Sequence, residues 1–183
     1  MNFRNHFLLA MPALSGSIFS DTITYMCEHN EHGAMGIIIN RPLNLSVEEM
    51  LEHLQLSADG RLRQTPVMAG GPVQGDRGVV LHRSTKHQWE RCLKVSDEIS
   101  LTTSRDILAA IAEGTGPEDN LIALGYAGWG AGQLESEILE NSWLTLPTDS
   151  AIIFDTPYQQ RFSKAAEQLG VNMNLISGEA GHA

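Results

Sequence analysis

The sequence contains little that would point to a disulfide framework, a membrane span or a secretion signal. Its 183 residues include only two cysteines, Cys27 and Cys92, which lie far apart and form no CxxC pair. Neither a disulfide framework nor a zinc motif is therefore indicated. The apolar runs are far too short to cross a bilayer, and residues 1–11 lack a signal-peptide cleavage pattern. We expect a cytoplasmic protein without membrane contact.

Basic residues are also scarce. Twelve Lys and Arg stand against 22 Asp and Glu, which gives a net charge of −10, and no basic run occurs. A nucleic-acid backbone is bound by clustered Lys and Arg, so direct contact with DNA or RNA is disfavoured. Hydrophobic residues make up 42% of the chain and charged residues 19%, as is ordinary for a globular protein.

The alternation of apolar runs with turn residues predicts one domain over residues 1–183, with a loose tail at 177–183. Two of the expected strands, 66–69 and 79–82, are expected to pair as a hairpin. The expected strands are 6–11, 22–28, 35–39, 66–69, 79–82, 92–95, 99–102, 121–126 and 151–154.

Helices are marked by caps and by apolar spacing. Ser46 and Glu49 form a capping box for the first helix, and Thr103 and Asp106 suggest another for a helix over 104–113. Two further helices follow residues 132 and 157. Hairpins outnumber strand–helix–strand crossovers, so the expected fold is α+β, with a mixed, largely antiparallel sheet flanked by about four helices in a single compact domain.

The hairpin over residues 22–42 carries the densest group of chemically capable side chains. His29 and His32 offer nitrogen donors near its tip, and His82 would have to complete a zinc site. The spacing is not HExxH and lies on a turn, which removes the geometric reason for the two histidines to converge. No metal is expected, and the tip is predicted to be a solvated polar turn.

An enzyme remains an alternative, with Cys27 as nucleophile and His29 as base. The two residues are two apart on a strand, so regular alternation places them on one face. Backbone N–H groups of residues 130–132 would supply an oxyanion site for acyl or thiol chemistry. The same alternation puts Cys27 beside Ile23 and Tyr25, which favours a buried packing role instead.

The glycine-rich stretch over residues 125–132 is interpreted as a tight loop between a strand and a helix. It lacks the Lys-Ser/Thr ending of a P-loop and is not GxGxxG. A loop of this kind can present N–H groups to an anion, but Glu135 already complements the helix dipole. No cofactor is predicted.

Three arginines stand beside turns or caps, namely Arg41, Arg77 and Arg105. They can either gather into an anion pocket or pair with local carboxylates such as Asp76 and Asp106. Both readings remain open on the sequence.

The leading hypothesis is a non-enzymatic or regulatory protein that binds a small anionic ligand or a protein partner. Arg41 and Arg105 would contact the anion, and Asn30 and Gln133 would supply hydrogen bonds.

Several short motifs span essentially the whole chain, namely FLLAMP (7–12), EHN (28–30), GAMGIIINRP (33–42), GGP (70–72), TSRD (103–106), GYAGW (125–129), GQLE (132–135), NSWL (141–144) and AGHA (180–183). Together they resemble the YqgE/AlgH family. The resemblance implies a soluble, cytoplasmic bacterial protein of compact α+β fold, in a family whose biochemical activity is not established. The AlgH name implies an association with transcriptional control of alginate synthesis, although the acidic charge and the lack of a helix-turn-helix signal argue against direct DNA reading.

Overall fold

A computed structural model describes residues 1–172, and within them the chain forms ten strands, five α-helices and one 3-10 helix. The tail expected at 177–183 lies outside the described residues. The strands are β1 (His6–Ala10), β2 (Ile23–Asn30), β3 (Gly33–Ile38), β4 (Pro42–Ser46), β5 (Pro66–Ala69), β6 (Val73–Arg83), β7 (Cys92–Lys94), β8 (Ile99–Thr102), β9 (Asn120–Gly130) and β10 (Trp143–Pro147). The helices are η1 (Pro12–Leu14), α1 (Val47–His53), α2 (Arg105–Glu113), α3 (Gln133–Leu139), α4 (Ser150–Phe154) and α5 (Tyr158–Gln168).

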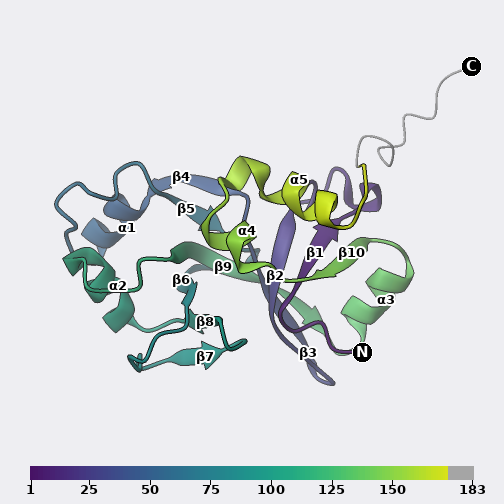
Figure 1. Ribbon diagram of the computed structural model, residues 1–183, viewed down its shortest axis with the longest axis horizontal. Helices are drawn as coiled ribbons and strands as arrows, with labels where there is room; N and C mark the ends of the chain where they lie inside the picture. Colours follow the sequence, from purple (N-terminus) through teal and green to yellow (C-terminus); the bar gives the residue numbers. More distant parts are fainter. Residues whose placement is uncertain (173–183) are drawn as a thin grey trace, which may run out of the picture.

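The strands join into one curled sheet in the order β10-β1-β2-β3-β9-β6-β8-β7, with β4 and β5 attached through β9 (Figure 1). The β5–β9 pair is parallel, and the other described pairs are antiparallel. The expected α+β class with a mixed, largely antiparallel sheet is confirmed. No helix among the described residues is long and apolar enough to span a bilayer.

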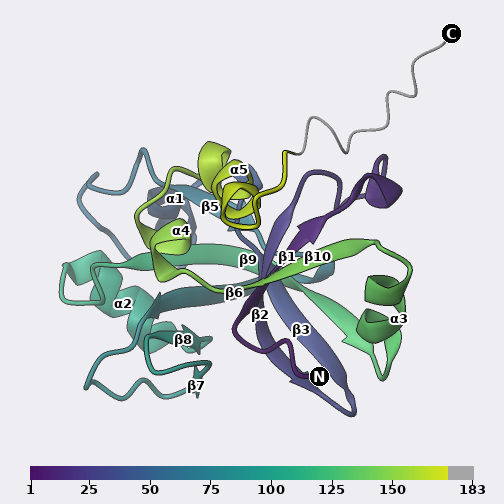
Figure 2. The ribbon, with the colours of Figure 1, turned by 45° about the vertical axis from the view of Figure 1, so that its right-hand side comes forward.

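Helices cover the sheet in three places, and each covers its own apolar cluster. Helices α4 and α5 lie over the middle of the sheet, α1 and α2 lie together toward one end, and α3 lies at the other (Figures 1 and 2). On β9, Ala123 packs into the cluster with α4 and α5, whereas its neighbour Ile122 packs into the cluster with α1 and α2. This alternation follows from the period of two along a strand. The sheet is therefore buried on both faces at β9.

The expected hairpin between residues 66–69 and 79–82 is wrong. Strands β5 and β6 both pair with β9, in opposite directions, rather than with each other. The glycines between them allow this arrangement, because a Cβ on Gly70 would lie 2.3 Å from the Gly125 oxygen. At Gly71, where φ is +154°, a Cβ would lie 2.1 Å from the Tyr126 carbonyl carbon. The GGP and GYAGW motifs thus meet in a backbone-to-backbone contact.

The glycine-rich stretch is therefore mostly strand rather than loop. Strand β9 continues to Gly130, and α3 starts at Gln133. Residues 151–154 are also corrected, from strand to the helix α4, whose N-cap Asp149 accepts a hydrogen bond from the Ala151 N–H at 3.0 Å. A short apolar run fits either structure, so the cap decides.

Both expected helix caps can be checked against the structure. Ser46 and Glu49 form the capping box of α1, as predicted. In α2 the N-cap is Ser104 rather than Thr103, and its hydroxyl donates to Asp106 at 2.5 Å. The capping box expected on Thr103 and Asp106 is therefore wrong, because the Ser104 side chain accepts no hydrogen bond from the first turn of α2.

Candidate functional site

The tip of the β2–β3 hairpin is a solvated turn except at His29. Strand β2 runs to Asn30 and β3 begins at Gly33, so Glu31 and His32 form the turn. The His32 side chain is 86% exposed and lies 3.5 Å from the Glu31 carboxylate. His29, in contrast, is only 6% exposed, which the expected polar tip did not anticipate.

Both ring nitrogens of His29 have partners. Its Nδ1 accepts a hydrogen bond from the Phe3 N–H at 2.9 Å, and its Nε2 lies 2.6 Å from Glu135 Oε1. Because Nδ1 accepts, the ring proton lies on Nε2 and is donated to the carboxylate. A hydrogen bond from its own backbone N–H, and then the one from His29, lowers the pKa of Glu135. His29 thus ties the N-terminal segment and α3 to β2.

These contacts leave His29 without a lone pair for a metal ion. Across residues 1–172, no group of three or more His, Cys, Asp or Glu side chains is arranged to hold one. Both ring nitrogens of His82 are also in hydrogen bonds. Its Nε2 lies 2.8 Å from the Thr102 hydroxyl, and its Nδ1 lies 2.9 Å from the Arg83 carbonyl oxygen. The structure does not bring His29, His32 and His82 together as ligands.

Cys27 lies in a β-bulge that separates it from His29. The register shifts between Met26 and Glu28, so Cys27 is the extra residue on β2. An extra residue reverses the alternation of side chains beyond it. Cys27 packs in the main core, whereas His29 stacks on Phe3 in the cluster beneath α3. The expectation that Cys27 and His29 share a face is therefore wrong.

The environment of Cys27 is that of a core residue. Its side chain is fully buried. Burial, followed by the nearby Glu28 carboxylate, raises the pKa of the Cys27 thiol well above its usual range. A nucleophilic cysteine needs a thiolate and a base within reach, and the described surroundings of Cys27 supply neither. Cys92 is exposed instead.

Two of the proposed ligand-binding residues, Asn30 and Gln133, lie at the same end of the sheet. Gln133 accepts a hydrogen bond from the Gly130 N–H at 3.0 Å, where β3 and β9 pair. The Asn30 side chain accepts from the His32 N–H at 2.8 Å. Both side chains thus stabilise the turns on which they stand.

The two proposed arginines are placed apart. Arg41 donates to the carbonyls of Ile18 and Ser20, in the segment before β2. Arg105 donates to the Leu54 carbonyl at 2.9 Å, at the end of α1. Arg41 and Arg105 therefore do not form a common site with Asn30 and Gln133.

A pocket of about 350 Å³ lies between α1, α2 and β6, and we call it the α1–α2 pocket. It is lined by two kinds of side chain that come from different elements. Its apolar lining consists of Leu45, Met50, Leu54, Leu108 and Leu124. Its polar lining consists of His53, Asp76, Arg77, Thr103 and Arg105.

Strand β6 approaches α1 closely beside the pocket because it has no side chain at Gly78. Gly78 of β6 faces α1, and a Cβ there would lie 2.9 Å from Met50 Cε. Met50 is 7% exposed and Leu108 of α2 is 8% exposed, so these two side chains form a nearly buried wall. The capping box of α1 fixes the helix that carries Met50.

Neither of the two arginines at the pocket is in an ion pair with a carboxylate of residues 1–172. Arg77 donates to the side chain of Gln74 at 3.2 Å, and neither Arg77 nor Arg105 forms an ion pair with a described residue. Local pairing with Asp76 or Asp106, which the sequence left open, is thus not observed. The cationic head groups remain available at the rim of an apolar hollow.

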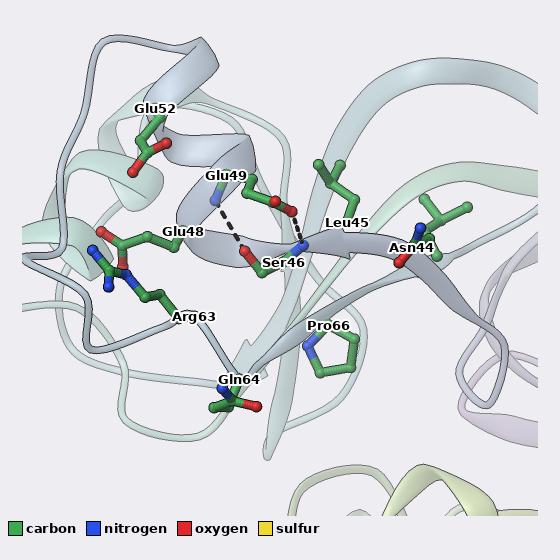
Figure 3. A pocket seen from close by; sticks show the side chains of 10 residues that line it. Asn44, Leu45, Ser46, Glu48, Glu49, Glu52, Arg63, Gln64 and Pro66 are labelled. Carbon is green, nitrogen blue, oxygen red and sulfur yellow. Dashed lines mark hydrogen bonds between the residues drawn. The ribbon is translucent and has the colours of Figure 1, made fainter.

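A second hollow, of about 560 Å³, lies on the other side of α1 and is rich in carboxylates (Figure 3). Its acidic groups are largely used by the fold. Glu48 accepts hydrogen bonds from three backbone N–H groups of the loop 58–62. Glu49 caps α1 through Ser46, and Arg63 lies beside Glu48 (Figure 3). The carboxylates of Glu48 and Glu49 in this hollow therefore serve to cap α1 and to hold the loop 58–62 in place.

The fold and the site define an α+β protein with a curled, largely antiparallel sheet and an arginine-rimmed pocket. A family model described as AlgH-like matches residues 7–174. The chain therefore belongs to the AlgH-like family, as its motifs predicted.

Relatives in other bacteria match nearly the whole chain. A UPF0301 protein of Nitrosococcus oceani is 56% identical over 99% of this chain and 97% of its own. The solution structure of the AlgH protein from Pseudomonas aeruginosa is 50% identical, covers 100% of this chain and 97% of its own, and has a TM-score of 0.82. The crystal structure of protein DIP2367 from Corynebacterium diphtheriae has a TM-score of 0.74 at 16% identity, over 94% of this chain and 90% of its own, and so shares the fold.

Proposed function

We propose that this protein is a non-enzymatic binding protein whose α1–α2 pocket takes a small ligand with a negative charge. One observation carries the proposal. Arg77 and Arg105 stand at the rim of an apolar pocket, and neither pairs with a carboxylate among the described residues. In a chain with 12 basic and 22 acidic residues, two such arginines at one pocket create a local site for an anion.

Guanidinium groups suit this role because they bind carboxylates and phosphates through paired N–H groups. Arg105 donates one hydrogen bond, to the Leu54 carbonyl, which fixes its head group at the pocket rim. Its other N–H groups have no hydrogen-bond partner within the described part of the chain. A site that is held in place before the ligand arrives binds with less loss of side-chain freedom.

Two of the three arginines considered from the sequence, Arg77 and Arg105, are kept, and His53 is a further polar residue at the pocket. Asn30, Arg41 and Gln133 are left out because their side chains bond to other segments.

A small ligand is favoured over a protein partner by the distribution of exposed apolar groups. Ile18 precedes β2, Leu43 lies on β4 and Leu139 ends α3, so these exposed side chains stand on separate elements. A docking face for a protein is usually a contiguous apolar patch, whereas small ligands use concave pockets. We also place the protein in the cytoplasm, because its two cysteines are free.

The test is ligand-induced stabilisation at constant ionic strength. We expect carboxylates to raise the melting temperature of the wild-type protein, since a ligand that binds the native state stabilises it. Arg105→Gln should weaken binding by about tenfold or more, because a charge-assisted hydrogen bond is lost. Arg77→Gln should weaken it in the same direction.

Arg63→Gln is the matched control, since it removes the same charge from the neighbouring hollow on the other side of α1. It should leave the affinity nearly unchanged. The proposal fails if no carboxylate or phosphate stabilises the protein, or if Arg63→Gln weakens binding as much as Arg105→Gln.

A further inference from the structure

We infer that the ligand of the α1–α2 pocket is an amphipathic monoanion, a single carboxylate joined to a short apolar body. This inference rests on the proposed function and narrows it. The pocket presents charge at its rim and hydrocarbon on its wall, so a ligand that fills it must offer both. Inorganic anions and polar dianions carry the charge but have no apolar part.

The apolar wall is the first argument. Leu45, Leu54 and Leu124 line the pocket and are partly exposed, beside the nearly buried Met50 and Leu108. An ion with no apolar part would leave this hydrocarbon in contact with water, whereas an alkyl or aryl group would cover it. Affinity should therefore grow with the apolar surface that the ligand buries.

The balance of charge is the second argument. Arg77 and Arg105 are opposed by the carboxylate of Asp76 on the same rim, so the lining has one net positive charge when His53 is neutral. A monoanion matches this balance. A second negative charge on the ligand would have to lie near Asp76 or against the apolar wall, and both places are unfavourable.

Size is the third argument. The pocket volume of about 350 Å³ lies near the lower end of the range for small-molecule sites, which is about 300–1,000 Å³. A dinucleotide or a long lipid chain would not fit within it. The volume suits a metabolite-sized acid with a short alkyl chain or a single ring.

The experiment measures affinity along a homologous series. Acetate, butyrate, hexanoate and octanoate are titrated into the wild-type protein at fixed ionic strength, and binding is followed by calorimetry and by the Arg105 side-chain N–H resonance. Each added methylene should tighten binding by about fourfold until the pocket is full, since its burial contributes about 0.8 kcal/mol. Succinate, inorganic phosphate and 1-hexanol should bind more weakly than hexanoate.

Gly78→Ala tests where the apolar chain lies. The added methyl group would stand 2.9 Å from Met50 Cε, so Met50 must move within the pocket. We expect the affinity gained with each added methylene to be smaller in this variant, while the affinity for acetate stays unchanged. Gly75→Ala is the control, because a Cβ at Gly75 meets nothing within 4 Å and the residue does not line the pocket.

The outcomes separate this inference from the proposed function. If carboxylates perturb Arg105 but all chain lengths bind equally, the amphipathic class is wrong and the anion site stands. If succinate or phosphate binds more tightly than hexanoate, the monoanion class is wrong. If no anion perturbs Arg105, or if 1-hexanol binds as tightly as hexanoate, both ideas fail.

Discussion

The contact between the two glycine motifs makes a sharp prediction about Gly70→Ala. Gly70 joins β5 to the turn before β6, and its backbone does not adopt the left-handed conformation. A methyl group there would lie 2.3 Å from the Gly125 oxygen and 3.1 Å from Ala123 Cβ. The neighbouring atom is main chain, so a rotamer change cannot relieve the overlap. Strand β9 would have to shift away from β5.

The expected cost follows from this overlap. Forcing a methyl group into a filled space costs about 1–3 kcal/mol, and occasionally more when backbone must move. For a domain of about this size, 1 kcal/mol lowers the melting temperature by about 2–4 °C. Gly70→Ala should therefore melt about 2–12 °C below the wild-type protein.

Thermal and urea unfolding, each followed by circular dichroism, would measure the change. Gly75→Ala provides the control, because it is the same substitution at a position with nothing within 4 Å. It should melt close to the wild-type temperature. If Gly70→Ala is as stable as Gly75→Ala, the two motifs are not in close backbone contact and the glycine-rich stretch needs another explanation.

Three further predictions concern thiols, the buried histidine and DNA. A thiol reagent should modify Cys92 quickly in the native protein and Cys27 at least about a thousandfold more slowly, because modification of Cys27 requires unfolding; rapid loss of both thiols would contradict its burial. His29→Ala should lower the free energy of unfolding by about 1–3 kcal/mol in urea titrations, since the Phe3 N–H loses its acceptor; an unchanged midpoint would count against that hydrogen bond. Duplex DNA should show no salt-dependent binding, and an affinity that falls steeply with added salt would contradict this expectation.

Local signals in the sequence predicted those elements that depend on neighbouring residues. The capping box of Ser46 and Glu49 starts α1 as expected, and the helix expected over 104–113 is α2, which ends before the left-handed Gly114. The β2–β3 hairpin was also predicted. In each case the residues that stabilise the structure lie within a few positions of one another, so the sequence pattern contains the interaction.

Features set by partners far along the chain were not predicted. The bulge at Cys27 depends on how β2 pairs with β3, and its consequence for His29 cannot be read from alternation alone. The stretch up to Gly130 was interpreted as a loop because glycine is common in turns. In the structure, Gly125 instead allows Gly70 and Gly71 to approach β9, because a Cβ on Gly125 would lie 2.4 Å from the Gly71 oxygen.

The missed helix α4 shows a third kind of failure. Residues 151–154 are apolar and partly β-branched, and a run of that length fits either a buried strand or one turn of helix. The deciding signal was present, because Asp149 caps the helix by accepting from the Ala151 N–H. Weighing the cap above the composition of the run would have given the correct element.

The arginines show why the candidate site could be only partly predicted. Arg41, Arg77 and Arg105 all stand beside turns or caps, and nothing in the sequence ranks them. The three arginines differ in the surroundings of their guanidinium groups. Arg41 donates hydrogen bonds to the carbonyls of Ile18 and Ser20. Arg77 and Arg105 instead line a pocket to whose wall α1 contributes.

That wall depends on contacts between elements that are far apart in the sequence. Met50 of α1 lies against Gly78 of β6, an element far along the chain, and a Cβ on Gly78 would stand 2.9 Å from Met50 Cε. A binding pocket is thus defined as much by the missing side chain as by those present. On the proposed function, we therefore expect Gly78→Ala to displace Met50 and to weaken the binding of hexanoate more than that of acetate, and titrations of both acids into this variant would measure the effect directly.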